Sequence, residues 1–321
     1  MNAKRTQPTI AMVVPTYLRD DLLRACLDSV VAQKDSDVTV YVGDNAASDE
    51  TRAVVETYDD RFIYKRWAAN LGAPGNYAQL VLEATEDYIV CLHDDNILLP
   101  EFVARVRGVV TSEPDIDIVF SGFDLIDGEG KPMPSHQLSK LSFRSKLPAG
   151  RLTFGRRTRS YVLLIRQSFQ PAVPCLIRRS VLQPHIARAA ESITYDYHLM
   201  AALGLSNATL FYVPESIALS RVHERSYTQS VGWVPDRLAE TRRLGTETSS
   251  RFDQALLKLL ALRDVLLLRY AENPAVKVAF KTLDALLFRW SDAPLKALVG
   301  RRPSARKSLS SPGKRIPENF R

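Results

Sequence analysis

Cysteine is scarce in this chain of 321 residues, and no long apolar run is present. An odd number of cysteines set among apolar neighbours excludes a disulfide framework and favours a reducing, cytosolic location; they are Cys26, Cys91 and Cys175. No run approaches the ~18 to 20 uncharged apolar residues that cross a bilayer, and the first thirty residues lack the pattern of a signal peptide. We therefore expect a cytoplasmic protein, at most peripheral on the inner face of a membrane.

Acidic residues are absent from one long segment. Between residues 130 and 190 there are twelve Lys and Arg and no Asp or Glu. Residues 251–321 hold 15 basic and 6 acidic residues, so the first 250 residues carry a net charge of −2 although the whole chain carries +7. An excess of positive charge in one segment favours anionic partners, although a charge run is also typical of a solvated surface.

These two basic segments carry separate expectations. Arginines of the first segment are candidates to meet a diphosphate or an anionic acceptor: Arg151, Arg156, Arg157, Arg159 and Arg166. The tail, residues 296–321, has almost no apolar residues after position 301, so we expect it to be disordered and available to anionic lipid headgroups.

The rest of the composition, 45% hydrophobic and 25% charged, is that of an ordinary globular protein. A chain of this length buries roughly three quarters of its extended-state surface, so its core needs no metal or disulfide. Any metal that the sequence implies therefore has a functional role.

Apolar runs typical of buried strands alternate with helical periodicity in the first hundred residues. Strands are expected near 9–16, 38–44, 62–65 and 88–92, with helices at 20–33, 51–58 and 76–84. Further strands are expected at 116–123 and 209–213, with strand or helix pieces near 161–165 and 172–177 and a helix at 195–205. This alternation predicts a doubly wound α/β domain over residues 1–230, followed by a helical extension at 231–295.

Polar clusters follow four of the expected strands, at residues 15–19, 43–49, 70–76 and 93–96. The carboxyl ends of parallel strands meet at one edge of such a sheet, so the four clusters can line one pocket. In the last cluster, Asp94 and Asp95 stand beside Asn96 at the end of a buried strand, where like charges repel. A Mg²⁺ or Mn²⁺ ion shared with a nucleotide diphosphate relieves that repulsion, although a helix cap or a simple turn explains the residues equally well.

In their order and spacing, the four clusters resemble those of family 2 glycosyltransferases of the GT-A fold; the sequences are Val-Val-Pro-Thr-Tyr (13–17), Val-Gly-Asp-Asn (42–45), Asn-Leu-Gly-Ala-Pro-Gly-Asn (70–76) and Leu-His-Asp-Asp-Asn (92–96). The resemblance covers roughly residues 9–225. It implies a mostly parallel sheet flanked by helices that binds a nucleotide-diphosphate-sugar. It also implies a nucleoside pocket formed by Thr16, Tyr17, Arg19, Asp44 and Asn45 and continued by Asn70 and Asn76.

Asp95 matches the metal-binding aspartate of that family. His93 stands where its first aspartate is expected and is a candidate to contact the donor, unless it is only a satisfied histidine at a strand end. Asp94 is a candidate to replace that first aspartate. Arg221 and His223 resemble a segment that closes over the diphosphate, with His223 a candidate further metal ligand or, alternatively, a surface histidine.

The resemblance also implies a general base. Residues 194–203 are similar to the family's Glu-Asp-X-X-Leu segment, in which Asp196 matches the base and Tyr195 replaces the first acid. A helix start keeps such a carboxylate ionised, which also suits a purely structural interaction with the helix dipole.

We therefore expect an inverting, metal-dependent glycosyltransferase that acts on a carbohydrate or lipid-linked acceptor in cell-surface polysaccharide or glycolipid synthesis. In this hypothesis the helical extension packs beside the catalytic domain, covers the acceptor side or forms a homodimer. A nucleotidyltransferase is disfavoured because the loop after the first strand has no glycine, and a nucleic-acid-binding protein because no recognised motif with interleaved aromatics is present.

Overall fold

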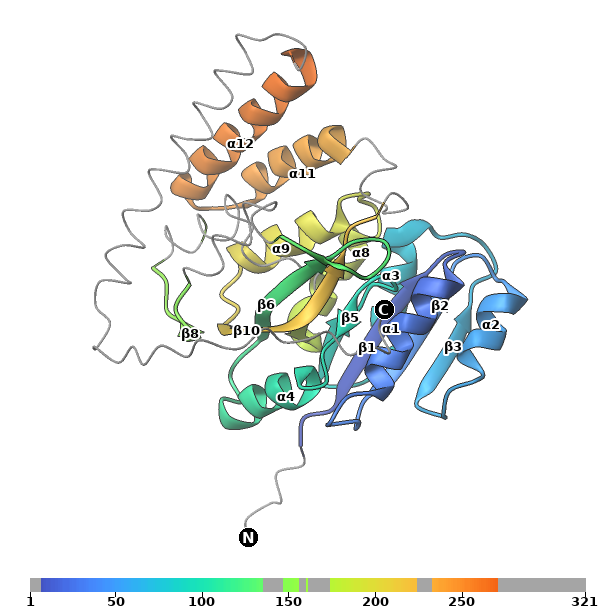
Figure 1. Ribbon diagram of the computed structural model, residues 1–321. Helices are drawn as coiled ribbons and strands as arrows, with labels where there is room; N and C mark the ends of the chain where they lie inside the picture. Colours follow the sequence, from blue (N-terminus) through green and yellow to red (C-terminus); the bar gives the residue numbers. More distant parts are fainter. Residues whose placement is uncertain (1–6, 135–146, 156–159, 161–173, 224–232, 271–321) are drawn as a thin grey trace.

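One mixed β-sheet organises the protein (Figure 1). The computed structural model describes residues 7–134, 147–155, 160, 174–223 and 233–270. Within these residues, ten strands pair in the order β3-β2-β1-β4-β9-β6-β10-β5, with β7 beside β6 and β8 beside β10. Their bounds are β1 (Ile10–Thr16), β2 (Thr39–Asp44), β3 (Phe62–Arg66), β4 (Tyr88–Cys91), β5 (Ile97–Leu98), β6 (Ile118–Ile126), β7 (Pro132–Met133), β8 (Gly150–Leu152), β9 (Cys175–Arg178) and β10 (Leu210–Arg221).

The first half of the sheet is parallel, because β1, β2 and β3 are each followed by a helix that crosses back over the sheet. Every residue of β1 is buried, as its uninterrupted apolar run predicts. In the register of this half, Thr16 lies opposite Asp44, so the polar strand ends coincide. The second half is mixed, since β9 is antiparallel to both β4 and β6.

Helices cover both faces of the sheet and are α1 (Asp20–Val31), α2 (Asp49–Val55), α3 (Gly72–Glu83), α4 (Phe102–Ser112), α7 (Arg179–Leu182), α8 (Ile186–Ala189), α9 (Tyr195–Leu205), α11 (Trp233–Glu247) and α12 (Arg251–Tyr270), with a 3₁₀ turn at Gln183–His185. Residues of β1 alternate between two cores: Ala11 and Val13 pack with α3 and α9, whereas Met12 and Val14 pack with α1, α2 and α4. The sheet is therefore buried on both faces, as the doubly wound fold requires.

The C-terminal helices pack on the α9 side of the sheet (Figure 1). Leu244 of α11 and Leu257 of α12 belong to the same core as Met200 of α9. A buried ion pair between Arg237 and Asp264 joins α11 to α12, with Nε and Oδ2 2.9 Å apart. The rest of the expected extension and the basic tail lie outside the described residues.

Helix α1 begins at residue 20, as the sequence predicts, with Asp20 and Asp21 in its first turn and no side chain capping it. Helix α3 begins at Gly72 instead of 76, because Gly72 adopts a left-handed φ of 70° that turns the chain into the helix early. The early start places Asn76 inside α3, where it faces the sheet.

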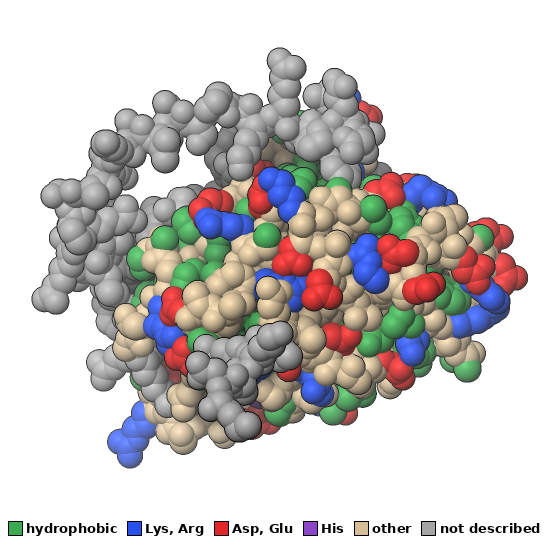
Figure 2. All heavy atoms as spheres, turned by 90° about the horizontal axis from the view of Figure 1, so that it is seen from below, with side chains coloured by type: hydrophobic (Ala, Val, Ile, Leu, Met, Phe, Trp, Pro, Cys, Tyr) green, Lys and Arg blue, Asp and Glu red, His purple; other side chains and the backbone are tan. Residues whose placement is uncertain are grey.

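None of the helices in the described residues combines the length and apolarity that crossing a membrane requires. On the face shown in Figure 2, acidic and basic side chains lie interspersed, in keeping with the near balance of charge over residues 1–250.

Candidate active site

The polar clusters after β1, β2, β4 and in front of α3 meet at one edge of the sheet. The hydroxyl of Thr16 donates to Asp94 Oδ2 at 2.7 Å across two neighbouring strands. The backbone N–H of Asn45 donates to the carbonyl of Thr16 at 3.1 Å, and Asn76 Nδ2 donates to the carbonyl of Gly43 at 2.8 Å. The expected convergence of these segments is therefore present.

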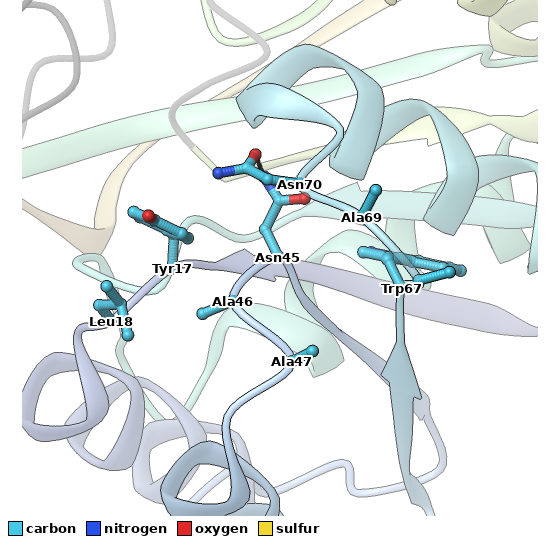
Figure 3. A pocket seen from close by; sticks show the side chains of 9 residues that line it. Tyr17, Leu18, Asn45, Ala46, Ala47, Trp67, Ala69 and Asn70 are labelled. Atoms are coloured by element: carbon cyan, nitrogen blue, oxygen red, sulfur yellow. Dashed lines mark hydrogen bonds between the residues drawn. The ribbon is translucent and has the colours of Figure 1, made fainter.

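A cavity of about 290 Å³ lies at this edge, near the lower end of the ~300–1,000 Å³ usual for ligand pockets. In Figure 3, Tyr17 and Trp67 stand on opposite sides of it, and Asn45 and Asn70 lie between them. Asn45 Nδ2 donates to Asn70 Oδ1 at 2.7 Å, which ties the loop after β2 to the loop before α3. Aromatic walls and amide groups suit a planar heterocycle that also forms hydrogen bonds.

The backbone around this cavity is strained. Leu18 and Ala47 both line it, and they are the non-glycine residues with positive φ in the described part of the chain, at 52° and 54°. A left-handed conformation costs a residue with a side chain about 1–3 kcal/mol, and such strain clusters at functional sites. Hydrogen bonds from the backbone N–H groups of Ala46 and Ser48 to Asp44 hold the loop around Ala47 in its conformation.

Four of the residues expected to form or continue the nucleoside pocket are not part of the cavity lining: Thr16, Arg19, Asp44 and Asn76. Asp44 is fully buried and accepts hydrogen bonds from the backbone N–H groups of Ala46 and Ser48 and from the Tyr64 hydroxyl. These bonds fix the shape of the loop after β2. Asn76 accepts a hydrogen bond from the Trp67 indole at 2.7 Å and so sets the position of that ring.

Gly43 permits this arrangement. A Cβ at position 43 would lie 2.2 Å from Asn76 Oδ1 and 2.9 Å from the Leu80 side chain. The glycine therefore lets α3 approach the end of β2 closely, which brings Asn76 and, through it, Trp67 to the cavity.

The two adjacent aspartates differ in environment. Asp94 is fully buried, accepts from Thr16 and forms an ion pair with Arg19, whose Nη2 lies 2.7 Å from Asp94 Oδ1. The side chain of Asp95 is 12% exposed; its Oδ2 lies 3.2 Å from His223 Nε2 and 3.5 Å from Arg19 Nη1.

These environments separate the two pKa values. Burial raises the pKa of Asp94 to about 7 despite the opposing charge of Arg19, and the neighbouring Asp95 charge adds to the rise. Burial also acts to raise the pKa of Asp95, but the hydrogen bond to His223 and the nearby cations lower it overall. Asp95 is therefore the more acidic member of the pair and the one that solvent reaches.

Arg221 brings further positive charge to the same loop. Its Nε donates to the backbone carbonyl of Asp95 at 3.3 Å, and its Nη1 donates to the carbonyls of Asp127 and Gly128 at 3.2 and 3.1 Å. Burial lowers its pKa, although the Asp95 charge opposes this effect. Arg221, His223 and Arg19 thus surround Asp95 with cationic or potentially cationic groups.

The donor set fits a divalent ion only in part. Across the described ranges, no three His, Cys, Asp or Glu side chains converge on a point that would hold a metal. Asp95 and His223 present two adjacent donors, and Mg²⁺ is typically held by one or two carboxylates together with substrate phosphates. The residues therefore fit an ion whose remaining ligands come from a diphosphate and water.

His93 connects this loop to α9. Its Nε2 is hydrogen-bonded to the Tyr195 hydroxyl at 2.6 Å. Burial lowers the pKa of His93, while the charges of Asp95 and Asp196 raise it by a smaller amount. Asp196 lies in the first turn of α9, half-buried, and its Oδ1 accepts the backbone N–H of Tyr197 at 2.8 Å. The two positions at which the chain departs from the family pattern are thus in direct contact.

Reasoning from the sequence missed several residues of the site. Trp67 directly follows β3, and its place at a strand end was the available signal. Leu18, Ala46 and Ala47 lie within the predicted clusters at 15–19 and 43–49, but nothing in the sequence singled them out, since their contribution is backbone shape. Arg151 lies on β8 and pairs with Glu113 and Asp115. The other arginines proposed for the acid-free segment, at positions 156, 157, 159 and 166, lie outside the described residues.

Solved structures support the fold. S. aureus TarS (residues 1–349, in complex with UDP-GlcNAc) is 14% identical, with a TM-score of 0.61 over 90% of this chain and 83% of that one. The mannosyltransferase PcManGT from Pyrobaculum calidifontis, in complex with GDP-Man and Mn²⁺, is 15% identical, with a TM-score of 0.57 over 93% and 89% of the two chains. At these identities the likeness shows the shared GT-A fold, which confirms the expected fold class.

Sequence relatives are glycosyltransferases. The abequosyltransferase RfbV of Salmonella typhimurium is 28% identical over 127 residues, 37% of this chain and 38% of that protein. The GalNAc(5)-diNAcBac-PP-undecaprenol beta-1,3-glucosyltransferase of Campylobacter jejuni is 31% identical over 96 residues, 29% of this chain and 31% of that protein. The matches thus span about a third of each relative's length. The model of glycosyl transferase family 2 matches residues 11–185, more than half of the chain, so this chain belongs to glycosyl transferase family 2.

Proposed function

We propose that the protein transfers a sugar from a nucleotide-diphosphate-sugar to an acceptor hydroxyl with inversion at the anomeric carbon. The observation that carries this proposal is the position of one aromatic-walled cavity at the same sheet edge as the cationic surroundings of Asp95. The bound UDP-GlcNAc and GDP-Man of the two structural neighbours support a donor of this class.

The nucleoside of the donor occupies the cavity. Tyr17 and Trp67 stack on the base or the ribose, and Asn45 and Asn70 supply hydrogen bonds. Thr16, Asp44 and Asn76 hold the loops that carry these groups. The diphosphate then extends from the cavity toward Arg19 and Arg221, whose charge compensates its own, and toward His223.

Asp95 and His223 are the residues that would hold Mn²⁺ or Mg²⁺, in line with the Mn²⁺ present in PcManGT. Such an ion supplies positive charge that stabilises the departing diphosphate. Asp94 is too deeply buried to act as a ligand in this arrangement and instead orients Arg19.

Asp196 acts as the general base. The acceptor oxygen forms a bond to the anomeric carbon from the face opposite the diphosphate, and its proton passes to an Asp196 carboxylate oxygen. The bond between the anomeric carbon and the diphosphate oxygen breaks, and the nucleoside diphosphate leaves with the electron pair. His93 and Tyr195 link the donor-side loop to the helix that carries the base.

A lipid-linked or other carbohydrate acceptor agrees with the polyprenyl-linked substrate in the name of the Campylobacter relative. We place the reaction in cell-surface polysaccharide or glycolipid synthesis, at the inner face of a membrane that the basic tail contacts, and a homodimer remains part of the proposal. Membership of the glycosyltransferase family speaks against the nucleotidyltransferase and nucleic-acid-binding alternatives.

Asp196→Asn tests the proposed chemistry. A general base contributes about 10²- to 10⁴-fold, so transfer should fall by that factor while UDP or GDP binding with Mn²⁺ stays within twofold of the unmodified protein. Transfer is measured as nucleoside diphosphate released from a panel of nucleotide-sugars in the presence of bacterial lipid extract. Full turnover by the variant would remove Asp196 as the base.

A further inference from the structure

We infer that Asp236 of the C-terminal helix α11 is a positioning residue for the base Asp196, an inference that rests on the proposed function. The extension would then be part of the catalytic apparatus rather than only a cover or a dimer contact.

One oxygen of Asp236 accepts three hydrogen bonds from the start of α9. Asp236 Oδ2 lies 2.6 Å from Thr194 Oγ1, 2.9 Å from the backbone N of Thr194 and 2.7 Å from Ser192 Oγ. Thr194 and Ser192 are buried, at 7% and 4% exposure. Hydrogen bonds to a carboxylate are stronger than those between neutral groups, so this oxygen is a strong anchor.

These bonds replace an ordinary helix cap. Thr194 is the N-cap of α9, and a threonine there usually accepts a hydrogen bond from the first turn. Its side chain makes no such bond and donates to Asp236 instead. The entry into α9 is therefore fixed from outside the helix, by a residue 42 positions later in the chain.

The base lies two residues beyond this anchor. Asp196 is in the first turn of α9, so a rotation or shift of the helix start moves its carboxylate directly. General-base catalysis needs the carboxylate within hydrogen-bond reach of the acceptor hydroxyl, and a misplacement of about 1 Å costs on the order of 10²-fold.

Two further contacts align α11 with α9. The hydroxyls of Tyr197 and Thr241 are 2.9 Å apart, and His198 Nδ1 is hydrogen-bonded to Glu240. Asp236 and Glu240 are one helical turn apart and so lie on the same face of α11. That face therefore holds α9 at its N-cap and again within its first turn.

The test compares Asp236→Ala with Glu247→Gln, a change of a half-exposed carboxylate farther along the same helix. We expect kcat of Asp236→Ala to fall by about 10- to 100-fold, with UDP or GDP affinity in the presence of Mn²⁺ changed less than twofold. Asp236→Asn keeps an acceptor oxygen and should recover at least a third of the original kcat. Glu247→Gln should leave kcat within twofold.

Unchanged kcat per folded molecule in Asp236→Ala would overturn the inference, as would a loss that only follows the unfolded fraction measured by circular dichroism. Should that variant fail to fold, Thr194→Val decides the matter: it removes the hydroxyl that donates to Asp236, and we expect kcat to fall at least threefold. Asp196→Asn separates the two proposals. If it is inactive while Asp236→Ala is fully active, only the positioning role fails; if it is fully active, the base assignment itself fails.

Discussion

The contact between α9 and α11 carries a measurable dependence on pH. Glu240 of α11 is buried and hydrogen-bonded to His198 of α9 and to Arg243. Burial alone would raise the pKa of Glu240, but these hydrogen bonds and charges exceed that effect and lower its pKa from 4.5 to about 2. Glu240→Gln replaces the carboxylate by an amide that does not titrate. The substitution therefore removes the difference between the pKa values of Glu240 in the folded and unfolded states.

The sign of the effect follows from linkage. A carboxylate whose pKa is lowered on folding stabilises the folded state fully above its unfolded value of 4.5, and this stabilisation is lost as pH falls through about 2. Each pKa unit corresponds to about 1.4 kcal/mol, so the shift bounds the contribution at roughly 3 kcal/mol. Because the introduced amide retains part of the hydrogen bonding, we expect Glu240→Gln to destabilise the protein by about 1–3 kcal/mol at pH 7.

Urea unfolding followed by circular dichroism at pH 7, 4 and 3 measures this contribution. The difference between the unmodified protein and Glu240→Gln should be largest at pH 7 and should shrink as the pH falls below 4.5. Glu215→Gln, on an exposed carboxylate of β10, is the control and should change stability by less than about 0.5 kcal/mol. A difference that is constant from pH 7 to pH 3 would refute the reasoning.

Three further changes probe the site. Tyr195→Phe leaves the buried ring of His93 without its hydroxyl partner, so we expect a loss of about 1–3 kcal/mol in thermal unfolding and a fall in kcat larger than any change in donor affinity; unchanged stability would contradict this. Trp67→Ala removes one aromatic wall of the cavity and should weaken UDP or GDP binding about 5- to 150-fold in calorimetry. Equal affinity would mean that the nucleobase binds elsewhere. Gly43→Ala forces a Cβ against the asparagine of α3 and should cost about 1–3 kcal/mol, while Gly108→Ala, with open space around it, should be neutral or stabilising.

The sequence predicted those elements whose periodicity is local. The strand run over 9–16, the alternation with helices and the helix at 195–205 follow from apolar spacing alone, and the structure places β1 and α9 at these positions. The convergence of the four polar clusters could also be predicted from the sequence, because a parallel sheet brings its strand ends to one edge. The family match confirms the glycosyltransferase interpretation that these clusters suggested.

Contacts between distant segments could not be predicted from the sequence. The hydrogen bond between His93 and Tyr195 joins residues 102 positions apart, and it depends on how α9 packs against the end of β4. The anchoring of Thr194 by Asp236 depends in the same way on the packing of α11. Side-chain direction was equally hidden: Asp44 turns into its own loop, which its position at a strand end does not reveal.

In the proposed function, a divalent ion at Asp95 helps to bind the donor diphosphate. Calorimetry of UDP and GDP binding with and without Mn²⁺ tests it most directly, in the unmodified protein, in Asp95→Ala and in Asp49→Ala, an exposed aspartate of α2 that serves as the control. Mn²⁺ should strengthen binding by about tenfold or more in the unmodified protein and the control, and by less than twofold in Asp95→Ala. An equal Mn²⁺ enhancement in Asp95→Ala would contradict the claim.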